Sequence, residues 1–159
     1  MQKDVILTPE GLEKLKVEIE FLSGQKRREV AERIKEAREF GDISENSEYD
    51  DAKNEQMMLE ARIASLEEKL RSATVIDQSE LDGNIVRVGV TVDTKDDAGK
   101  TDTFMIVGST EADPSAQPKR LSNESPVGKA LLGHKKGDTV EVHLPSGKVR
   151  KLTVAQITV

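Results

Sequence analysis

Apolar residues recur at helical spacing through the first quarter of the chain. They alternate steps of three and four at Leu12, Leu15, Ile19 and Leu22. They resume slightly out of phase at Val30, Ile34 and Ala37. Such spacing is typical of a coiled-coil seam, and the offset around Gly24 resembles a stutter. No proline interrupts the run before Gly41, so we predict a first helix that extends to Glu39 or Phe40.

The start of this helix is marked by three consecutive residues. Thr8 is a favourable N-cap. Pro9 suits the first helical position, because its missing N–H costs nothing there. Glu10 favours the positive end of the helix dipole. We therefore predict that the helix begins here.

The second helical pattern is more regular. Its positions alternate steps of four and three with one polar member: Ala52, Gln56, Leu59, Ile63, Leu66, Leu70 and Ala73. Two such helices joined by a few residues are expected to fold back as an antiparallel hairpin, about 45 Å long at 1.5 Å per residue. A dimerisation coiled coil is the alternative. The short connection containing Gly41 favours pairing within one chain, so we expect a monomer.

Beyond Val75 the pattern changes to short β-type runs, many with period-two alternation. The runs are 85–92, 103–107, 139–144 and 149–159. Turn sequences separate them at 82–83, 97–99, 136–138 and 145–147. We predict a strand for each run.

One short helix interrupts these strands. Ser125 as N-cap, Pro126 in the first turn and Gly133 at the end predict it. The chain is therefore expected to have an α+β fold. An N-terminal antiparallel α-helical coiled-coil hairpin over residues 1–74 is followed by a small mixed β-sheet domain with one short helix over residues 75–159.

Composition excludes several function classes. Of 159 residues, 35% are hydrophobic and 34% charged, which is little core material for one compact ball. A net charge of -6 argues against wholesale wrapping of DNA. There is no cysteine, and His134 and His143 are too few for a closed zinc site. No apolar run approaches the roughly 20 residues that span a bilayer, and the N-terminus has no signal core. We expect a cytoplasmic protein without a membrane partner.

Carboxylates are concentrated between the two helical patterns, at residues 40–51. They are Asp42, Glu45, Glu48, Asp50 and Asp51, with Glu39 just before them. A short connection between paired helices lies at the end of the hairpin, so we expect these acids at its tip. Acids packed this closely repel one another by about 1 kcal/mol per pair at 4 Å in water. The concentration of these acids, despite their repulsion, indicates a functional role.

Asp42 and Glu45 are candidate ligands for Mg²⁺. They are three residues apart, so their carboxylates can converge on one side of a turn. Mg²⁺ prefers six oxygens and is usually held by one or two carboxylates together with substrate phosphates. Such a tip could not hold the metal tightly alone, but it could complete a site in another molecule. A metal there would lower the pKa of its bound water and stabilise leaving oxygens in phosphodiester hydrolysis.

Local physics favours a plainer interpretation of the same acids. Asp42 or Ser44 is a good N-cap, and Glu45 and Glu48 suit the positive end of a helix dipole. The basic residues behind the tip are likewise typical of a solvated face that supports ion pairs: Arg27, Arg28, Arg33, Lys35, Arg38 and Lys53. Of these, only Arg38 and Lys53 are close enough to the acids to guide an RNA phosphate toward them.

Three stretches of the chain are distinctive together. They are the tip GDISENSEY, the helix DDAKNEQMMLEARIASLEEKL that follows it, and the later run RLSNESPVGKALLGHKKGDTVEV. They resemble the Gre family of bacterial transcription elongation factors, GreA type. The resemblance extends from the opening ILTPEGLEKLKVEIEFL to the last strand. The string G-D-x-x-E-N-x-E-Y between coiled-coil helices is far more specific than a capping box.

The resemblance implies a factor that binds RNA polymerase and passes its coiled coil down the secondary channel. There it would help a backtracked polymerase cut the 3′ end of the nascent RNA. Asp42 and Glu45 match the family's tip acids and would help hold the second catalytic Mg²⁺, shared with the polymerase active site. The enzyme would be the polymerase, and the factor would supply ligands. Asn46, Glu48 and Tyr49 match the motif and would shape the tip, with packing or stacking roles open for Tyr49.

The resemblance also implies an FKBP-like C-terminal domain that docks on the polymerase. The segment that matches the docking loop places the contact at Ser122, Glu124 and Pro126. The alternative is that Ser125 and Pro126 only start a helix. Prolyl isomerase activity is an option for such a fold. We discount it, because Phe104 is the domain's only aromatic residue and an aromatic-lined proline pocket needs more.

Two further functions stay open. The chain could bind the secondary channel and modulate or inhibit the polymerase without stimulating cleavage, although the tip acids argue against this. It could also be a coiled-coil interaction module or chaperone unrelated to the polymerase. A cleavage assay on stalled complexes and co-purification with polymerase distinguish the three.

Overall fold

The computed structural model describes residues 5–41 and 46–159. The chain packs as two units, one formed by residues 12–72 and the other by residues 73–159 together with the N-terminal residues up to Gly11. The hairpin domain predicted from the sequence is longer and covers residues 1–74. The difference arises because β1 (Val5–Leu7) pairs in parallel with β2 (Ala73–Val75), which brings the first strand into the β-rich unit. None of the described helices is long and apolar enough to cross a membrane.

The first helical pattern forms three consecutive helical segments. They are α1 (Pro9–Phe21), the π-helical segment η1 (Leu22–Lys26) and α2 (Arg27–Glu39). The predicted helix and its end at Glu39 are confirmed. The phase offset noticed around Gly24 corresponds to η1, because a π-helical turn holds more residues than an α-helical turn and rotates the apolar positions that follow.

The predicted N-cap of α1 is also present. The Thr8 hydroxyl accepts a hydrogen bond from the Gly11 N–H at 3.0 Å. The same hydroxyl donates to one Glu111 carboxylate oxygen at 2.6 Å, and the Thr8 N–H donates to the other at 2.9 Å. Glu111 ends the 3₁₀ segment η4 (Ser109–Glu111). The buried Thr8 thus joins the start of α1 to a segment 103 residues away within the β-rich unit.

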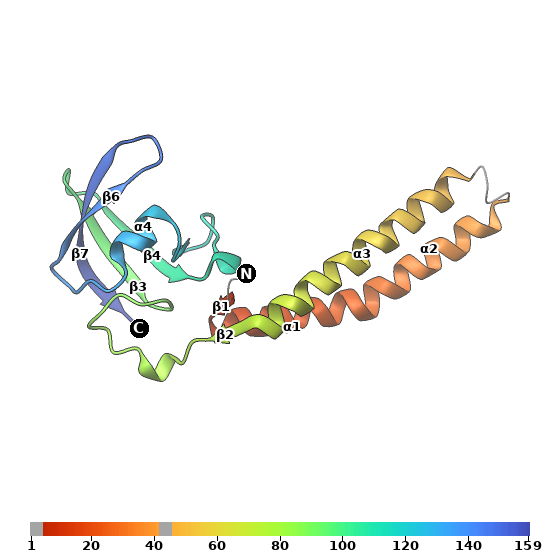
Figure 1. Cartoon of the computed structure of the whole chain (residues 1–159), viewed down its shortest axis with the longest axis horizontal. Coiled ribbons are helices and arrows are strands. Elements are labelled where there is room, and N and C mark those ends of the chain that lie inside the picture. Colours follow the sequence, from red (N-terminus) through yellow and green to blue (C-terminus); the bar gives the residue numbers. More distant parts are fainter. Residues whose placement is uncertain (1–4, 42–45) are drawn as a thin grey trace. The chain divides into compact units, whose positions relative to one another are not determined.

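The second helical pattern forms α3 (Ser47–Ser72), which lies beside α2 in Figure 1. The two helices bury a common core made by Val30, Ile34, Ala52, Leu59 and Ile63. Of the predicted seam of α3, Gln56, Leu70 and Ala73 are half-buried and the others are buried. The antiparallel hairpin within one chain is therefore confirmed.

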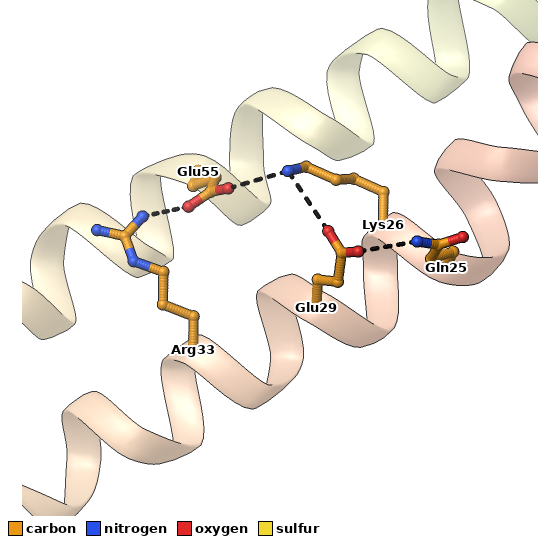
Figure 2. Close-up of polar contacts among 5 residues, drawn as sticks. All are labelled: Gln25, Lys26, Glu29, Arg33 and Glu55. Carbon is orange, nitrogen blue, oxygen red and sulfur yellow. Dashed lines mark hydrogen bonds and ion pairs between the residues drawn. The ribbon is translucent and has the colours of Figure 1, made fainter.

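Ion pairs connect the two sides of the hairpin outside its core. Glu55 of α3 lies between Lys26, at 3.7 Å, and Arg33 (Figure 2). Arg27 forms a two-pronged pair with Glu60, at 2.7 and 2.8 Å. The hydrogen bond from Arg27 lowers the pKa of Glu60 below its ordinary value. Exposed pairs add little stability, but their geometry matches only one register of α2 against α3.

The β-rich unit contains a five-stranded mixed sheet in the order β5-β4-β3-β7-β6 (Figure 1). The strands are β3 (Thr91–Asp96), β4 (Thr101–Val107), β5 (Lys119–Ser122), β6 (Thr139–His143) and β7 (Val149–Thr158). Only the β4–β5 pair is parallel. The predicted helix is α4 (Pro126–Leu131), whose fully buried Leu131 belongs to the core beneath the sheet. The mixed sheet with one short α-helix is confirmed.

One predicted strand is largely wrong. Of residues 85–92, only Thr91 and Val92 lie in a strand, and the chain turns at Val88 and Gly89 instead. Gly89 has a φ of 103°, in the left-handed region that suits glycine. Val86 and Val90 are nevertheless fully buried. The alternation of apolar and polar residues therefore predicted the buried side chains correctly and the backbone conformation incorrectly. The strands β1, β2 and β5 were not predicted, because three or four residues are too few for a period-two pattern.

Candidate functional site

The end of the hairpin is organised by Asn46. Its side-chain oxygen accepts a hydrogen bond from the Tyr49 N–H at 3.2 Å, which makes it the N-cap of α3. Its side-chain nitrogen donates to the Ala37 carbonyl oxygen in the last turn of α2, at 2.5 Å. One side chain thus holds the end of α2 beside the start of α3. The two helix ends that Asp42 and Glu45 lie between in the sequence are therefore joined directly.

Asp42 and Glu45, the predicted metal ligands, lie outside the described residues, as does Ser44. The capping interpretation offered Asp42 or Ser44 as the N-cap of the second helix. That interpretation is wrong, because α3 begins at Ser47 and its cap is Asn46. Helix capping therefore does not account for an acid at position 42.

The predicted tip-shaping residues differ in their surroundings. Tyr49 is half-buried and packs against the hairpin core. Glu48 is exposed in the first turn of α3, where a carboxylate suits the positive end of the helix dipole. Phe40, just beyond α2, is 82% exposed. Packing is the arrangement observed for Tyr49, whereas an aromatic ring at Phe40 is available to another molecule.

Five basic residues toward the end of the hairpin fall into two groups. Lys26, Arg27 and Arg33 form ion pairs with Glu55 and Glu60 of α3. Arg38 and Lys53, the predicted RNA-guiding residues, are exposed and form no ion pair within residues 5–41 and 46–159. The Lys53 ammonium donates to the Gln56 side-chain oxygen at 3.2 Å. The two cations nearest the tip are thus outside the ion-pair network.

The predicted docking residues surround one turn of the β-rich unit. Ser122 is the last residue of β5, and its hydroxyl lies 2.9 Å from that of Ser109 and accepts from the Glu124 N–H at 3.0 Å. The Ser109 hydroxyl in turn donates to the Glu124 carboxylate at 3.1 Å. Ser109 was not predicted, because it contacts residues 13 and 15 positions away and no local pattern reports such a contact.

The same turn leads into α4. The Ser125 hydroxyl accepts from the Gly128 N–H at 3.1 Å and donates to the Ser122 carbonyl oxygen at 2.6 Å, while the exposed Pro126 is the first helical residue. The helix start proposed as the alternative role for Ser125 and Pro126 is therefore present. It does not compete with docking, because Glu124 and Pro126 remain exposed while Ser125 forms the cap.

Within the described part of the chain, no group of three or more histidine, cysteine, aspartate or glutamate side chains could hold a metal ion. Asn46 was predicted to shape the tip. The sequence carries a signal for its capping role, because asparagine is a favoured N-cap and Tyr49, whose N–H it accepts from, lies three residues later.

Comparison with known proteins assigns both units. Residues 5–75 match the GreA/GreB family model described as "Transcription elongation factor, N-terminal", and residues 81–159 match "Transcription elongation factor, GreA/GreB, C-term". Transcription elongation factor GreA of Thermoanaerobacter pseudethanolicus is 52% identical over 99% of both chains. That of Acetivibrio thermocellus is 55% identical over 93% of this chain and 92% of the relative. A crystal structure of Gfh1, GreA factor homolog 1 of Thermus thermophilus, is 32% identical over 99% of this chain and all of that one, with a TM-score of 0.44. The chain belongs to the GreA/GreB family of transcription elongation factors.

Proposed function

We propose that this chain binds RNA polymerase, inserts its hairpin in the secondary channel and stimulates cleavage of the 3′ end of the nascent transcript in backtracked complexes. Membership of the GreA/GreB family supports the polymerase as the partner. The observation that supports the proposal is the Asn46 bridge, which holds the end of α2 beside the start of α3, the two helix ends that Asp42 and Glu45 lie between in the sequence. The polymerase is the enzyme, and this chain supplies groups to its active site.

Asp42 and Glu45 fit Mg²⁺ by their chemistry, because it takes oxygen ligands and often only one or two protein carboxylates. Two carboxylates leave most of the coordination positions to the polymerase site. When bound, the ion would lower the pKa of its water and stabilise charge on the leaving oxygen. Asn46, Glu48 and Tyr49 shape the segment, while Arg38 and Lys53 offer positive charge to an RNA phosphate.

Substitution of the two acids tests the chemical part of the proposal. Asp42→Asn and Glu45→Gln keep the size of each side chain and remove its charge. We expect polymerase binding to stay nearly unchanged. Stimulated cleavage should fall about tenfold or more, since even an outer-shell partner of a metal is worth that much. Raising the Mg²⁺ concentration should recover part of the loss, because the substitutions weaken a metal site. The measurement is RNA cleavage in stalled elongation complexes.

Asp51→Asn is the matched control, because Asp51 is an exposed carboxylate of α3 without a proposed ligand role. It should leave stimulated cleavage near the unsubstituted level. Full cleavage by the combined Asp42→Asn and Glu45→Gln variant would refute ligand donation. A chain that binds polymerase without stimulating any cleavage would instead be a modulator of the secondary channel.

The docking part of the proposal concerns Ser122, Glu124 and Pro126. Ser122 supports the turn through its hydroxyl contacts, whereas Glu124 and Pro126 are exposed at its surface. Replacing Glu124 and Pro126 together with alanine should weaken polymerase binding by about 1–2 kcal/mol or more. Cleavage at saturating factor should stay unchanged, because the hairpin carries the ligands. Binding can be measured by titrating labelled factor into core polymerase.

Glu141→Ala supplies the control for docking, because Glu141 is an exposed acid on β6 of the same unit. It should bind polymerase like the unsubstituted chain. Equal affinity of the double variant and this control would place the docking contact elsewhere on the protein.

A further inference from the structure

The aromatic ring of Phe40 is exposed at the end of α2. Its exposed fraction of 82% is the highest among the large hydrophobic residues that the structure describes. Of the other aromatic side chains, Phe104 is buried, Tyr49 packs against the hairpin core and Phe21 is about half exposed. Phe40 does not belong to the hairpin core, so packing gives no reason for a ring at this position. A single exposed apolar residue is common on protein surfaces, so the surroundings of the ring decide its meaning.

The backbone that carries the ring is fixed to the hairpin. Phe40 is the C-cap of α2, and its N–H donates to the Ala37 carbonyl oxygen at 3.3 Å. The same carbonyl oxygen accepts a hydrogen bond from the Asn46 side chain, which caps α3. The ring is therefore attached where the two helices are joined. Binding would restrict mainly its two side-chain torsions, which keeps the entropic cost small.

The other exposed side chains of this stretch are polar. Between Arg38 and Asn54, Phe40 is the one exposed large hydrophobic residue among those that the structure describes. Arg38 and Lys53 are exposed cations of the same stretch. Protein-binding surfaces gather apolar residues in patches, whereas proteins that bind single-stranded nucleic acid combine aromatic rings with positive charge. The composition of this stretch therefore favours a nucleic-acid base as the partner of the ring.

We propose that Phe40 stacks on an unpaired base at the 3′ end of the transcript and thereby positions the transcript for cleavage. This rests on the proposed function, in which Asp42 and Glu45 act on the same RNA. Phe40 precedes Asp42 by two residues, and two peptide units span at most about 7.6 Å between Cα atoms. A ring this close holds a base while the acids act at a neighbouring phosphate, and fixing the reacting group lowers the barrier. Phe40 is thus a positioning residue and not a metal ligand.

Stacking makes this contact depend on the base in a recognisable way. Every base has a π-face, so the contact accepts any transcript sequence, and its preferences follow the strength of stacking. A purine has two fused rings and offers more stacking area than a pyrimidine. Phe40 should therefore make stimulated cleavage faster when the unpaired base is a purine.

Cleavage of matched transcripts tests the proposal with the full chain and RNA polymerase. Stalled elongation complexes are assembled on synthetic RNA and backtracked by one nucleotide, with adenine, uracil or no base at the unpaired 3′ position. At saturating factor, Phe40→Ala should slow stimulated cleavage of the adenine transcript about tenfold, the range expected for one lost stacking contact. The loss should be smaller with uracil and absent with the abasic transcript, where the ring has no partner. Cleavage of each complex without the factor supplies the baseline.

Three further substitutions separate stacking from other causes. Phe40→Trp keeps an aromatic surface and should retain the purine preference. Phe40→Leu keeps the apolar character without a ring and should behave like Phe40→Ala. Phe21→Ala removes an exposed ring elsewhere on the hairpin and should leave cleavage unchanged. The Phe40 variants should unfold at the same temperature as the unsubstituted chain, because Phe40 lies outside the core.

The outcomes distinguish this proposal from the proposed function. If the unsubstituted chain stimulates cleavage of none of the transcripts, the proposed function is wrong and the stacking role is overturned with it. If the unsubstituted chain stimulates cleavage and Phe40→Ala does so equally on all three transcripts, only the stacking role is overturned. An equal loss on the adenine and abasic transcripts, or full activity of Phe40→Leu, would overturn it in favour of a contact between Phe40 and the polymerase protein.

Discussion

At the scale of single residues, Asn46 has two roles that the acids around it do not share. Its side-chain oxygen caps α3 and its nitrogen bonds the last turn of α2. Because a neutral amide does this work, the neighbouring carboxylates are not needed for capping. In the proposed function, the Asn46 amide therefore joins the ends of α2 and α3, and the acids supply negatively charged oxygens to the partner.

Asn46→Ala should destabilise the hairpin by about 1 kcal/mol, the usual cost of removing an N-cap. Chemical denaturation followed by helical circular dichroism measures the change. Asn46→Ser is the matched control, because a serine hydroxyl is also a favourable N-cap for the Tyr49 N–H and the change removes the donor to Ala37 without adding a charge. It should be clearly less destabilising than alanine. Equal stabilities of the alanine variant and the unsubstituted chain would show that the cap is unimportant.

At the scale of elements, the pairing of α2 with α3 depends on an apolar core and on charges beside it. The core residues specify which faces meet, but Leu, Ile and Val tolerate small sliding movements. The Arg27–Glu60 pair and the Lys26–Glu55–Arg33 group (Figure 2) join particular residues of the two helices. They favour one register, and thereby one position of the hairpin end.

The pKa of Glu60 gives this arrangement a pH dependence. The hydrogen bond from Arg27 lowers the folded-state pKa below the ordinary glutamate value of 4.5. The stabilisation is therefore complete above that ordinary value and is lost as the pH falls through the folded-state pKa. Glu60→Gln should lower the free energy of unfolding slightly at neutral pH and have no effect at strongly acidic pH. Urea denaturation at several pH values measures the difference.

Glu36→Gln serves as the comparison, because Glu36 is an exposed glutamate of α2. At neutral pH it should change the free energy of unfolding less than Glu60→Gln does, because Glu36 forms no ion pair within residues 5–41 and 46–159. A pH-independent effect of Glu60→Gln would contradict the importance of the Arg27–Glu60 hydrogen bond.

At the scale of the whole molecule, the hairpin and the β-rich unit each have a hydrophobic core of their own. One core lies between α2 and α3, and the other lies in the β-rich unit, with Val92, Ile106 and Leu131 among its members. In the proposed function the first unit carries the ligands and the second docks. Each unit has a core of its own, so a substitution in one core is expected to act mainly on its own unit.

Ile63→Ala and Leu152→Ala test this independence as a reciprocal pair. Each removes a side chain that is 2% exposed, one from each core, at an expected cost of about 2–5 kcal/mol. Hydrogen exchange resolved by region measures where protection is lost. Ile63→Ala should raise exchange mainly in α2 and α3, and Leu152→Ala mainly in the five-stranded sheet. Equal loss in both units from either substitution would show that the chain unfolds as one cooperative body.

The sequence by itself determined the features that follow from local periodicity. The seam of α3, the caps at Thr8 and Ser125 and the phase change near Gly24 were all predicted, because each depends on residues within one or two helical turns. The family resemblance also came from contiguous residues, and the two family models confirm it. The roles of Asp42 and Glu45 stay predictions, since both lie outside the described residues.

Only the tertiary structure decided the features that depend on distant residues. The pairing of β1 with β2 joins segments about 68 residues apart, and Thr8 meets Glu111 across 103. Ser109 reaches the docking turn through the fold, and Gly89 bends a run whose alternation resembled a strand. The local sequence pattern predicts which side chains are buried. Contacts between distant segments decide which backbone conformation buries them, and these contacts form only when the chain is folded.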